Sequence, residues 1–307
     1  MFDFIRAVIY YIGNVILFLP GSVMTMFYTD SIKGYFVNLN LMLYHICGVR
    51  IYIHGDISDE LISNAIYICN HRSKFDGLVI YSVLHTLHVD LKLIMKNSIR
   101  YIPIVGSILM NFGNIPIMRN REGSSQLKNA MENISTEEKA IMIFPEGRTM
   151  SLKNKKMNDD YCMKNNLPIY QNLLTPRITG IDIISKMTGY VDMYDMTIMY
   201  SFPELEKNVC HSYPDIFFAF PQKIDLFFEH HKIYDLENQL KDIFAKKDKI
   251  LTVMPCNLSN RLVKFNLYEC FIGFLLVFIF YIFLWYFPIY ILILIMTSYL
   301  ICITTEK

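Results

Sequence analysis

The cysteine pattern lacks the spacing of a structural metal site. The chain has seven cysteines, and none of them forms a C-x-x-C pair, the spacing typical of structural zinc ligands. Neither a zinc site nor a disulfide scaffold is indicated. We therefore expect free thiols in a reducing compartment and predict no metal site.

An excess of charge of one sign is also missing. The sequence has 29 lysine and arginine residues against 28 aspartate and glutamate residues, so its formal net charge is +1. No overall electrostatic field therefore favours nucleic acid or another acidic partner. Nucleic acid is accordingly not a predicted partner.

Long apolar stretches are what the sequence has instead. Its hydrophobic fraction is 53%, whereas soluble domains have about 45–50%. Residues 270–305 carry no charge, which is more than the roughly 20 residues that one membrane span needs and barely enough for two short spans. Pro288 lies near the middle, so we expect either one tilted, kinked helix or a hairpin of two short helices. A buried core helix would be shorter and less uniformly apolar.

The N-terminal region holds a second uncharged stretch. Residues 7–28 are numerous enough to span a bilayer, although Gly13 and Pro20 interrupt them, so a kinked or re-entrant segment also fits. A signal peptide is the competing interpretation, but only Arg6 marks a basic start, and we favour a retained anchor. The shorter stretch 34–49 could lie in the membrane interface.

Basic residues near these stretches predict the orientation. Several lysines and arginines lie between residues 241 and 264, just before the C-terminal stretch, and basic residues mark the cytosolic side of membrane proteins. We therefore predict N-terminal membrane-associated helices (1–49), a catalytic domain facing the cytosol (50–265) and a C-terminal transmembrane segment or hairpin (266–307).

The middle region alternates between strand and helix patterns. This alternation predicts an α/β fold, a mixed sheet with surrounding helices, flanked by the N-terminal and C-terminal membrane helices. Predicted strands cover 51–54, 65–69, 91–95, 115–118, 140–144, 196–200, 216–220 and 224–229. Predicted helices cover 77–87, 97–111, 124–134, 178–188 and 236–245. The polar segment Lys153–Asn166 is predicted to be a mobile loop.

The first candidate site is the segment Asn70–Asp76, which follows the strand 65–69 and opens the next helix. Ligands in α/β folds bind at the carboxyl ends of strands, where His71 stands. Asp76, five positions later, could fold back onto one imidazole nitrogen and leave the other free as a base. Such a pair, without a nucleophile, suits direct deprotonation of a substrate hydroxyl. The alternative is a loop histidine followed by a helix N-cap.

The second candidate is Phe144-Pro145-Glu146-Gly147-Arg148, which follows the strand 140–144. Gly147 permits a sharp turn, and Arg148 could bind a phosphate with two hydrogen bonds. A plain turn with surface charges is the alternative. Glu146 and Arg148 would then flank the turn at the end of a strand.

Two further arginines follow the same pattern. Arg119 ends the predicted strand 115–118 and could supply a second cation for a lipid phosphate, although a solvated arginine is the simpler interpretation. Arg177 lies at the entry to the helix 178–188, and helix N-termini favour anions. Because all four groups stand at the ends of elements on one domain, the order along the chain favours a single joint site.

These motifs resemble those of a known family. Asn70, His71 and Asp76 match Asn-His-x4-Asp, and residues 144–147 match Phe-Pro-Glu-Gly about seventy positions later. Both are typical of the glycerolipid acyltransferases, the group of 1-acylglycerol-3-phosphate and lysophospholipid acyltransferases. Residues 175–180, 191–198 and 244–248 are similar to the branch that contains lysocardiolipin acyltransferase. The resemblance covers about residues 45–255.

The resemblance implies a reaction and roles for residues. His71 would be the general base on the acceptor hydroxyl and Asp76 its orienting partner, and the hydroxyl would attack the acyl-CoA thioester directly. The substrate-binding residues would be Asn70, Arg119, Glu146, Gly147, Arg148 and Arg177. No metal or prosthetic group is expected, and acyl-CoA would be a co-substrate. The partners would be a lysophospholipid, acyl-CoA and membrane lipids, with the endoplasmic reticulum as the expected membrane.

Three positions depart from the family pattern. Gly77 stands where the family often has tryptophan, Arg148 precedes Thr149 where the family has threonine and then arginine, and Thr175 replaces a leucine. Because of these changes, the alternative to an active acyltransferase is a membrane scaffold that has the same fold but no catalytic activity. A lipid hydrolase is less favoured, because the G-x-S-x-G nucleophile elbow is absent. The sequence leaves the acceptor and the oligomeric state open.

Overall fold

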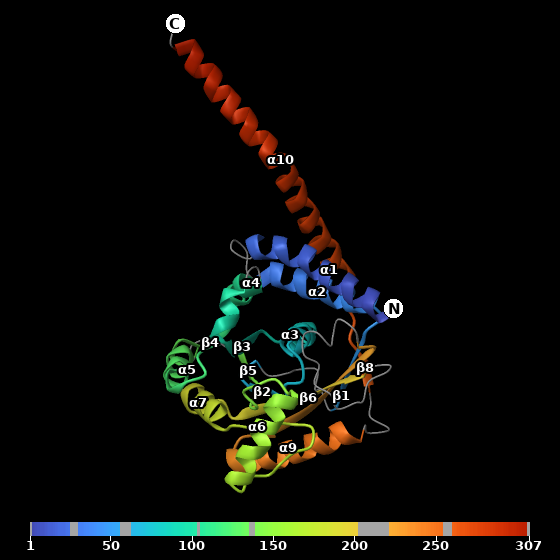
Figure 1. Cartoon of the computed structure of the whole chain (residues 1–307), viewed down its shortest axis with the longest axis vertical. Coiled ribbons are helices and arrows are strands. Elements are labelled where there is room, and N and C mark those ends of the chain that lie inside the picture. Colours follow the sequence, from blue (N-terminus) through green and yellow to red (C-terminus); the bar gives the residue numbers. More distant parts are fainter. Residues whose placement is uncertain are drawn as a thin grey trace.

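The structure is a computed structural model that describes residues 2–24, 30–55, 63–102, 105–134, 139–201, 221–253 and 260–305. An eight-stranded sheet runs through its centre, with helices on both faces (Figure 1). The predicted α/β class, a mixed sheet with surrounding helices, is therefore confirmed.

Most strands of the sheet are parallel. The strands are β1 (Arg50–His54), β2 (Ile66–Cys69), β3 (Leu91–Lys96), β4 (Ile115–Ile117), β5 (Ala140–Ile143), β6 (Asp192–Ser201), β7 (Lys223–Lys232) and β8 (Asn260–Leu262). Their order is β4-β3-β5-β2-β6-β7-β1-β8. The first five in this order are parallel, β7 is antiparallel to β6, and β1 is parallel to β7. The carboxyl ends of β2, β4 and β5 therefore meet at one edge.

The predicted strands agree with β1 to β5 within one residue at each end. Strands β6 and β7 extend beyond their predicted ranges, because the two pair with each other along their whole length. The short strand β8 was not predicted, and the predicted strand 216–220 lies outside the described residues. The sequence pattern therefore located the strands but not the length of this hairpin-like pair.

The helices follow most of the predicted ranges. They are α1 (Phe2–Met24), α2 (Asp30–Ile46), α3 (Asp76–Thr86), α4 (Val105–Asn111), α5 (Arg121–Ile134), α6 (Leu152–Lys164), α7 (Thr179–Thr188), α9 (Leu236–Thr252) and α10 (Leu267–Thr305). The single helix predicted over 97–111 is wrong, because a 3₁₀ turn, η1 (Asn97–Tyr101), comes before α4. Ile102, which precedes Pro103, has extended backbone angles, as residues before proline prefer.

The loop predicted at Lys153–Asn166 is also wrong, because this segment forms α6. The Ser151 side chain caps the helix by accepting a hydrogen bond from the Asn154 N–H (3.2 Å). Lys155 and Asp159 form an ion pair one turn apart. Cys162 is fully buried and gives the helix an attachment to the domain. The cap, the ion pair and the buried Cys162 together support a helix in a strongly polar segment.

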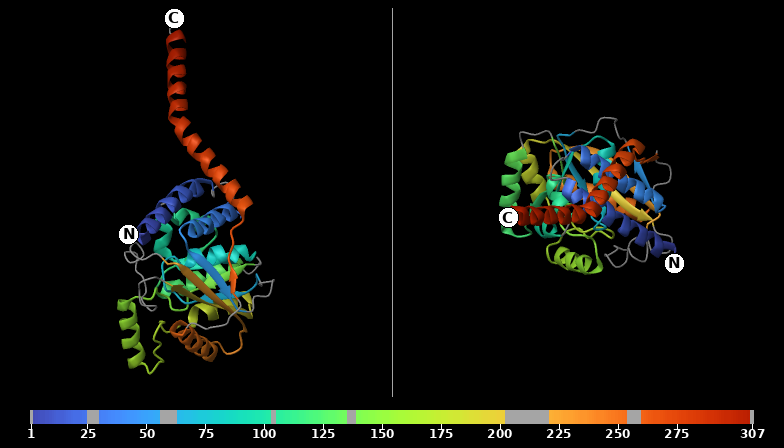
Figure 2. Two further views of the ribbon diagram at one scale, coloured as in Figure 1. Left: turned by 90° about the vertical axis from the view of Figure 1, so that its right-hand side faces the viewer. Right: turned by 90° about the horizontal axis from the view of Figure 1, so that it is seen from above.

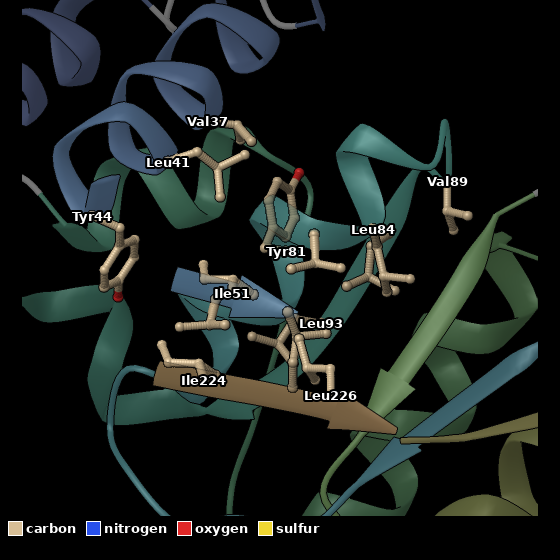
Figure 3. Close-up of a cluster of buried hydrophobic side chains, with 14 of the residues drawn as sticks. Val37, Leu41, Tyr44, Ile51, Tyr81, Leu84, Val89, Leu93, Ile224 and Leu226 are labelled. Atoms are coloured by element: carbon tan, nitrogen blue, oxygen red, sulfur yellow. The ribbon is translucent and has the colours of Figure 1, made fainter. Parts of the chain in front are cut away.

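The sheet separates two hydrophobic cores. In β2, Ile66 and Ile68 face the core formed with α5, α7 and α9, whereas Tyr67 and Cys69 face the core formed with α1, α2 and α3. This alternation follows from the two-residue period of a strand. Figure 3 shows the second core, in which Leu41 of α2 and Tyr81 of α3 lie over β1 and β7. The N-terminal helices therefore share a core with the sheet.

The apolar helices gather at one end of the molecule. Helix α10 starts against α1 and α2 and then extends away from the domain (Figures 1 and 2). The Tyr281 hydroxyl donates to the Ile16 carbonyl (3.2 Å). Gly273 lies so close to Leu39 that a Cβ at this position would be 2.7 Å from the Leu39 Cδ1 atom. The first half of α10 is therefore attached to both N-terminal helices.

Within the described part of the chain, one helix is long and apolar enough to cross a membrane, the Leu267–Tyr286 segment of α10. The C-terminal stretch forms the single helix and not the hairpin, which were the two predicted arrangements. The predicted N-terminal span corresponds to α1, whose apolar segment Val8–Leu17 is shorter than a span. An N-terminal membrane helix therefore stays a prediction.

Candidate active site

His71 and Asp76 lie next to each other where β2 ends and α3 begins. The Nδ1 atom of His71 is 2.8 Å from Oδ2 of Asp76, which is fully buried. The same oxygen accepts hydrogen bonds from the backbone N–H groups of Arg72 (2.6 Å) and Ser73 (2.8 Å). A carboxylate in this setting accepts, so Nδ1 carries the proton and donates. The lone pair of the imidazole is therefore on Nε2.

Tyr200 and Phe144 complete the support of this pair, and sequence reasoning missed both roles. The Tyr200 hydroxyl donates to Oδ1 of Asp76 (2.6 Å), and burial raises the pKa of Tyr200 well above its usual range, so it stays a donor. The Phe144 ring stacks on the His71 ring with centroids 4.2 Å apart. No sequence signal marks Tyr200, because only the neighbouring positions of β2 and β6 bring it to the site.

Glu146 lies behind His71 rather than at the surface. It is buried, and its two oxygens accept hydrogen bonds from the backbone N–H groups of His71 (2.7 Å) and Leu174 (2.9 Å). Burial raises the pKa of Glu146 to about 7. Sequence reasoning predicted that Glu146 binds substrate, but both oxygens are occupied by the protein backbone. The residue joins the loop after β2 to the loop before α7.

Asn70 follows β2 as predicted, and its side chain points into the sheet. Its side chain is fully buried, donates to the Ile198 carbonyl (3.0 Å) and accepts from the Ile198 N–H (2.8 Å). These bonds extend the pairing of β2 with β6 by one residue. In this structure the Asn70 amide is used within the sheet, and its contact with substrate stays a prediction.

Three arginines lie at the same edge of the sheet. Arg119 follows β4, Arg148 follows β5 and Arg177 precedes α7, and all three are exposed. Loss of surrounding water, together with the positive charges of Arg148 and Arg177, lowers the pKa of Arg119. Among the residues that the structure describes, none of the three forms an ion pair. An open group of guanidinium groups is suited to a phosphate dianion.

Arg177 lies close to the turn at Gly147. Gly147 has a φ of +66°, a conformation that other residues adopt only with strain. A Cβ atom at this position would be 3.9 Å from the Arg177 Cδ atom. The backbone N–H of Arg177 donates to the Pro145 carbonyl (2.9 Å). The structure therefore brings the predicted Arg148 and Arg177 to one turn.

Comparison with known proteins places these residues in a family. The family model described as Acyltransferase matches residues 50–185, which include His71, Asp76, Arg119 and Glu146. The chain carries a domain of the acyltransferase family. The predicted resemblance to the glycerolipid acyltransferases is confirmed by the relatives and the solved structure that follow.

Several curated proteins are similar to the acyltransferase domain. Lysocardiolipin acyltransferase 1 of Mus musculus is 26% identical over 210 residues, which cover 64% of this chain and 53% of that protein. Probable 1-acyl-sn-glycerol-3-phosphate acyltransferase 5 of Arabidopsis thaliana is 26% identical over 199 residues, 60% of this chain and 52% of that protein. The aligned segments span about half the length of these relatives.

The fold has a counterpart among solved structures. The crystal structure of the 1-acyl-sn-glycerophosphate (LPA) acyltransferase PlsC from Thermotoga maritima matches with a TM-score of 0.53 and 15% sequence identity. The match covers 83% of this chain and 98% of that chain. At this identity the likeness shows a shared fold, and it extends beyond the acyltransferase domain into the flanking helices.

The structure explains two departures of the acyltransferase domain from its family. A Cβ atom on Gly77 would be 3.0 Å from the Leu93 Cδ2 atom, so a larger residue at this position would require the Leu93 side chain to move. The Thr175 hydroxyl is 2.9 Å from the Cys162 sulfur, and the Thr175 N–H donates to the Asn158 side chain (3.1 Å). Thr175 thereby attaches α6 to the loop that carries Arg177.

The third departure places the Thr149 hydroxyl beside His71, the predicted general base. Because Arg148 and Thr149 are exchanged relative to the family pattern, Thr149 takes the second position after Gly147. Its Oγ1 atom is 3.0 Å from Nε2 of His71. Within the described residues, no group of three or more His, Cys, Asp and Glu side chains could hold a metal ion.

Proposed function

We propose that this chain transfers a fatty acyl group from acyl-CoA to the free hydroxyl of a lysophospholipid. One arrangement carries the proposal: a buried carboxylate holds Nδ1 of His71, and Thr149, the neighbour of Arg148, is bonded to Nε2. Arg148 lies within electrostatic reach of Arg119, as does Arg177, and none of these three arginines has an ion-pair partner among the described residues. The first feature is suited to removing a hydroxyl proton, and the second to holding a phosphate. The acyltransferase family model covers both.

The chemical step follows from the state of His71. Its Nε2 atom takes the proton of the acceptor hydroxyl while the hydroxyl oxygen attacks the thioester carbon. The C–S bond then breaks, and the CoA thiolate receives the proton from His71. The Asp76 carboxylate stabilises the imidazolium. General base catalysis of this kind contributes about 10²–10⁴-fold in rate.

The arginines support the substrate class. A lysophospholipid carries a phosphate close to its free hydroxyl, so a phosphate held by Arg119, Arg148 and Arg177 would bring that hydroxyl to His71. The names of the relatives, lysocardiolipin and 1-acyl-sn-glycerol-3-phosphate acyltransferases, agree with phosphate-bearing acceptors. Lysophosphatidic acid and lysocardiolipin are the first acceptors to test.

The apolar end supports an integral membrane protein. The Leu267–Tyr286 segment is long and apolar enough to span a bilayer. Helix α1 exposes a stripe of isoleucines at the same end: Ile5, Ile9, Ile12 and Ile16. We place residues 50–265 on the cytosolic side, with the endoplasmic reticulum as the compartment. A long-chain acceptor would then reach the site from the lipid layer.

A matched pair of histidine substitutions tests the function. Full-length protein in liposomes is given oleoyl-CoA and a panel of lysophospholipids, and free CoA is measured. His71→Asn removes the base and should lower transfer by about a hundredfold or more. His88→Asn is the control, because His88 is exposed at the far end of α3 with a φ of +60° that asparagine tolerates. Equal rates for His71→Asn and the native protein would refute the assignment, and no CoA release with any acceptor would favour the silent scaffold.

A further inference from the structure

We propose that the Thr149 hydroxyl occupies the position at His71 Nε2 that the acceptor hydroxyl takes during transfer, and that it thereby limits hydrolysis of the acyl donor by water. This inference rests on the proposed acyl transfer and on one further observation. Thr149 is the only described side chain whose hydrogen bond to Nε2 of His71 the structure records, at 3.0 Å.

The nitrogen can serve one hydroxyl at a time. Because Nδ1 of His71 donates to Asp76, Nε2 has a single lone pair and accepts one hydrogen bond. The Thr149 O–H donates to it in this structure. An acceptor hydroxyl must come within the same distance of Nε2 to lose its proton. The acceptor therefore has to displace Thr149 before transfer.

The backbone around Thr149 is held on both sides. The N–H of Met150 donates to the His71 carbonyl (2.7 Å), and the Asn154 side chain donates to the Thr149 carbonyl (2.8 Å). A β-branched side chain on a fixed backbone has few rotamers. The Thr149 hydroxyl therefore returns to Nε2 whenever the acceptor leaves, because the backbone hydrogen bonds on both sides fix the position of the residue.

Water is the competitor that this arrangement excludes. If a water molecule sat at Nε2, His71 would take one of its protons while its oxygen attacked the thioester carbon. The C–S bond would break, the CoA thiolate would take the proton from His71, and a free fatty acid would form. With the Thr149 hydroxyl on Nε2, this hydrolysis has no base until a hydroxyl of the right shape displaces the side chain.

Three substitutions at one position test the inference. CoA release from oleoyl-CoA is measured without acceptor, as hydrolysis, and with lysophosphatidic acid, as transfer. Thr149→Ala opens space for water and should raise the ratio of hydrolysis to transfer about tenfold, the factor that one lost hydrogen bond accounts for. Thr149→Ser restores the hydroxyl and should restore the low ratio. Thr149→Val keeps the volume, so its hydrolysis should stay low while its KM for the acceptor falls.

The outcomes separate this inference from the function. Transfer that survives His71→Asn would refute both. Transfer that depends on His71, with an unchanged hydrolysis ratio in Thr149→Ala and an unchanged acceptor KM in Thr149→Val, would overturn the role of Thr149 alone. An acyl group found on Thr149 by intact mass after incubation with oleoyl-CoA would also overturn it, because Thr149 would then be a nucleophile. If Thr149→Ala fails to fold, the acceptor KM of Thr149→Val decides.

Discussion

At the scale of single residues, the site depends on carboxylates that accept backbone hydrogen bonds. Asp76 and Glu146 are both buried, and each receives N–H groups from the loop that carries His71. The five-residue spacing from His71 to Asp76 was enough to predict their contact, because both stand in one short turn. Tyr200 was not predictable, because it comes 124 positions after Asp76 and only the sheet order brings it near.

Glu146→Gln tests this support through its pH dependence. A glutamine has only one oxygen acceptor, so its NH₂ group would face the N–H of either His71 or Leu174. This unpaired contact should lower the free energy of unfolding by roughly 1–3 kcal/mol. In the native protein the folded pKa of Glu146 is raised from 4.5 to about 7. Its contribution to stability is therefore full below about pH 4.5 and is lost as the pH rises through about 7.

Thermal unfolding from pH 4.5 to 8.5 measures this effect. The native protein should be more stable than Glu146→Gln at acid pH, and the difference between their melting temperatures should shrink from about pH 4.5 to about pH 7 and stay level above it. A difference that grows with pH would mean that Glu146 has a lowered pKa and that burial is not the dominant cause.

At the scale of elements, the positions of helices and strands were predictable where apolar periodicity was strong. Helix α3 and strands β1 to β5 agree closely with the prediction. Helix α6 did not, because it has one buried residue, Cys162, and a polar remainder. Its contacts with Thr175 come from tertiary structure, which a local pattern does not contain. The convergence of Arg119 and Arg148 followed from parallel strand ends, which the pattern did suggest.

Asp248 on α9 holds the loop that carries Arg177 through hydrogen bonds. Its substitution tests whether this attachment of the loop to α9 affects substrate binding. Its two oxygens accept hydrogen bonds from the N–H groups of Gln171 (2.8 Å) and Asn172 (2.6 Å). The same loop supplies the Leu174 N–H to Glu146. Asp248→Asn leaves one donor unpaired and should raise the KM for lysophosphatidic acid about tenfold, with a smaller effect on kcat.

The control for Asp248→Asn is Asp242→Asn on the same helix, since Asp242 is exposed. It should leave the KM unchanged. A non-phosphorylated acceptor such as a monoacylglycerol provides a second comparison. If Asp248→Asn affects this acceptor as strongly as lysophosphatidic acid, the loop does not act through the arginines that would hold the phosphate.

At the scale of the whole molecule, the uncharged stretches predicted an apolar end but not how its helices pack together. The length of the C-terminal stretch allowed one helix or two, and the choice depended on contacts far apart in sequence. Asn38 of α2 donates to Glu269 (2.7 Å) at the start of α10, and the Asn266 N–H donates to Asn38 (2.6 Å). These polar contacts fix α10 to the N-terminal helices, so α1 and α10 present their apolar surfaces at the same end.

This arrangement predicts that membrane binding is shared between α10 and α1. A chain that ends at Tyr268 loses the candidate span and should bind liposomes more weakly, yet the exposed face of α1 should keep part of it on the membrane. Adding Ile12→Glu, at a position that is 56% exposed, should release most of the remainder, because one exposed isoleucine buried in lipid contributes about 1.5–3 kcal/mol.

Val191→Glu is the matched control, since Val191 is 53% exposed on the catalytic domain. Liposome flotation measures all three, and equal flotation of the Ile12→Glu and Val191→Glu proteins would show that α1 does not face the lipid.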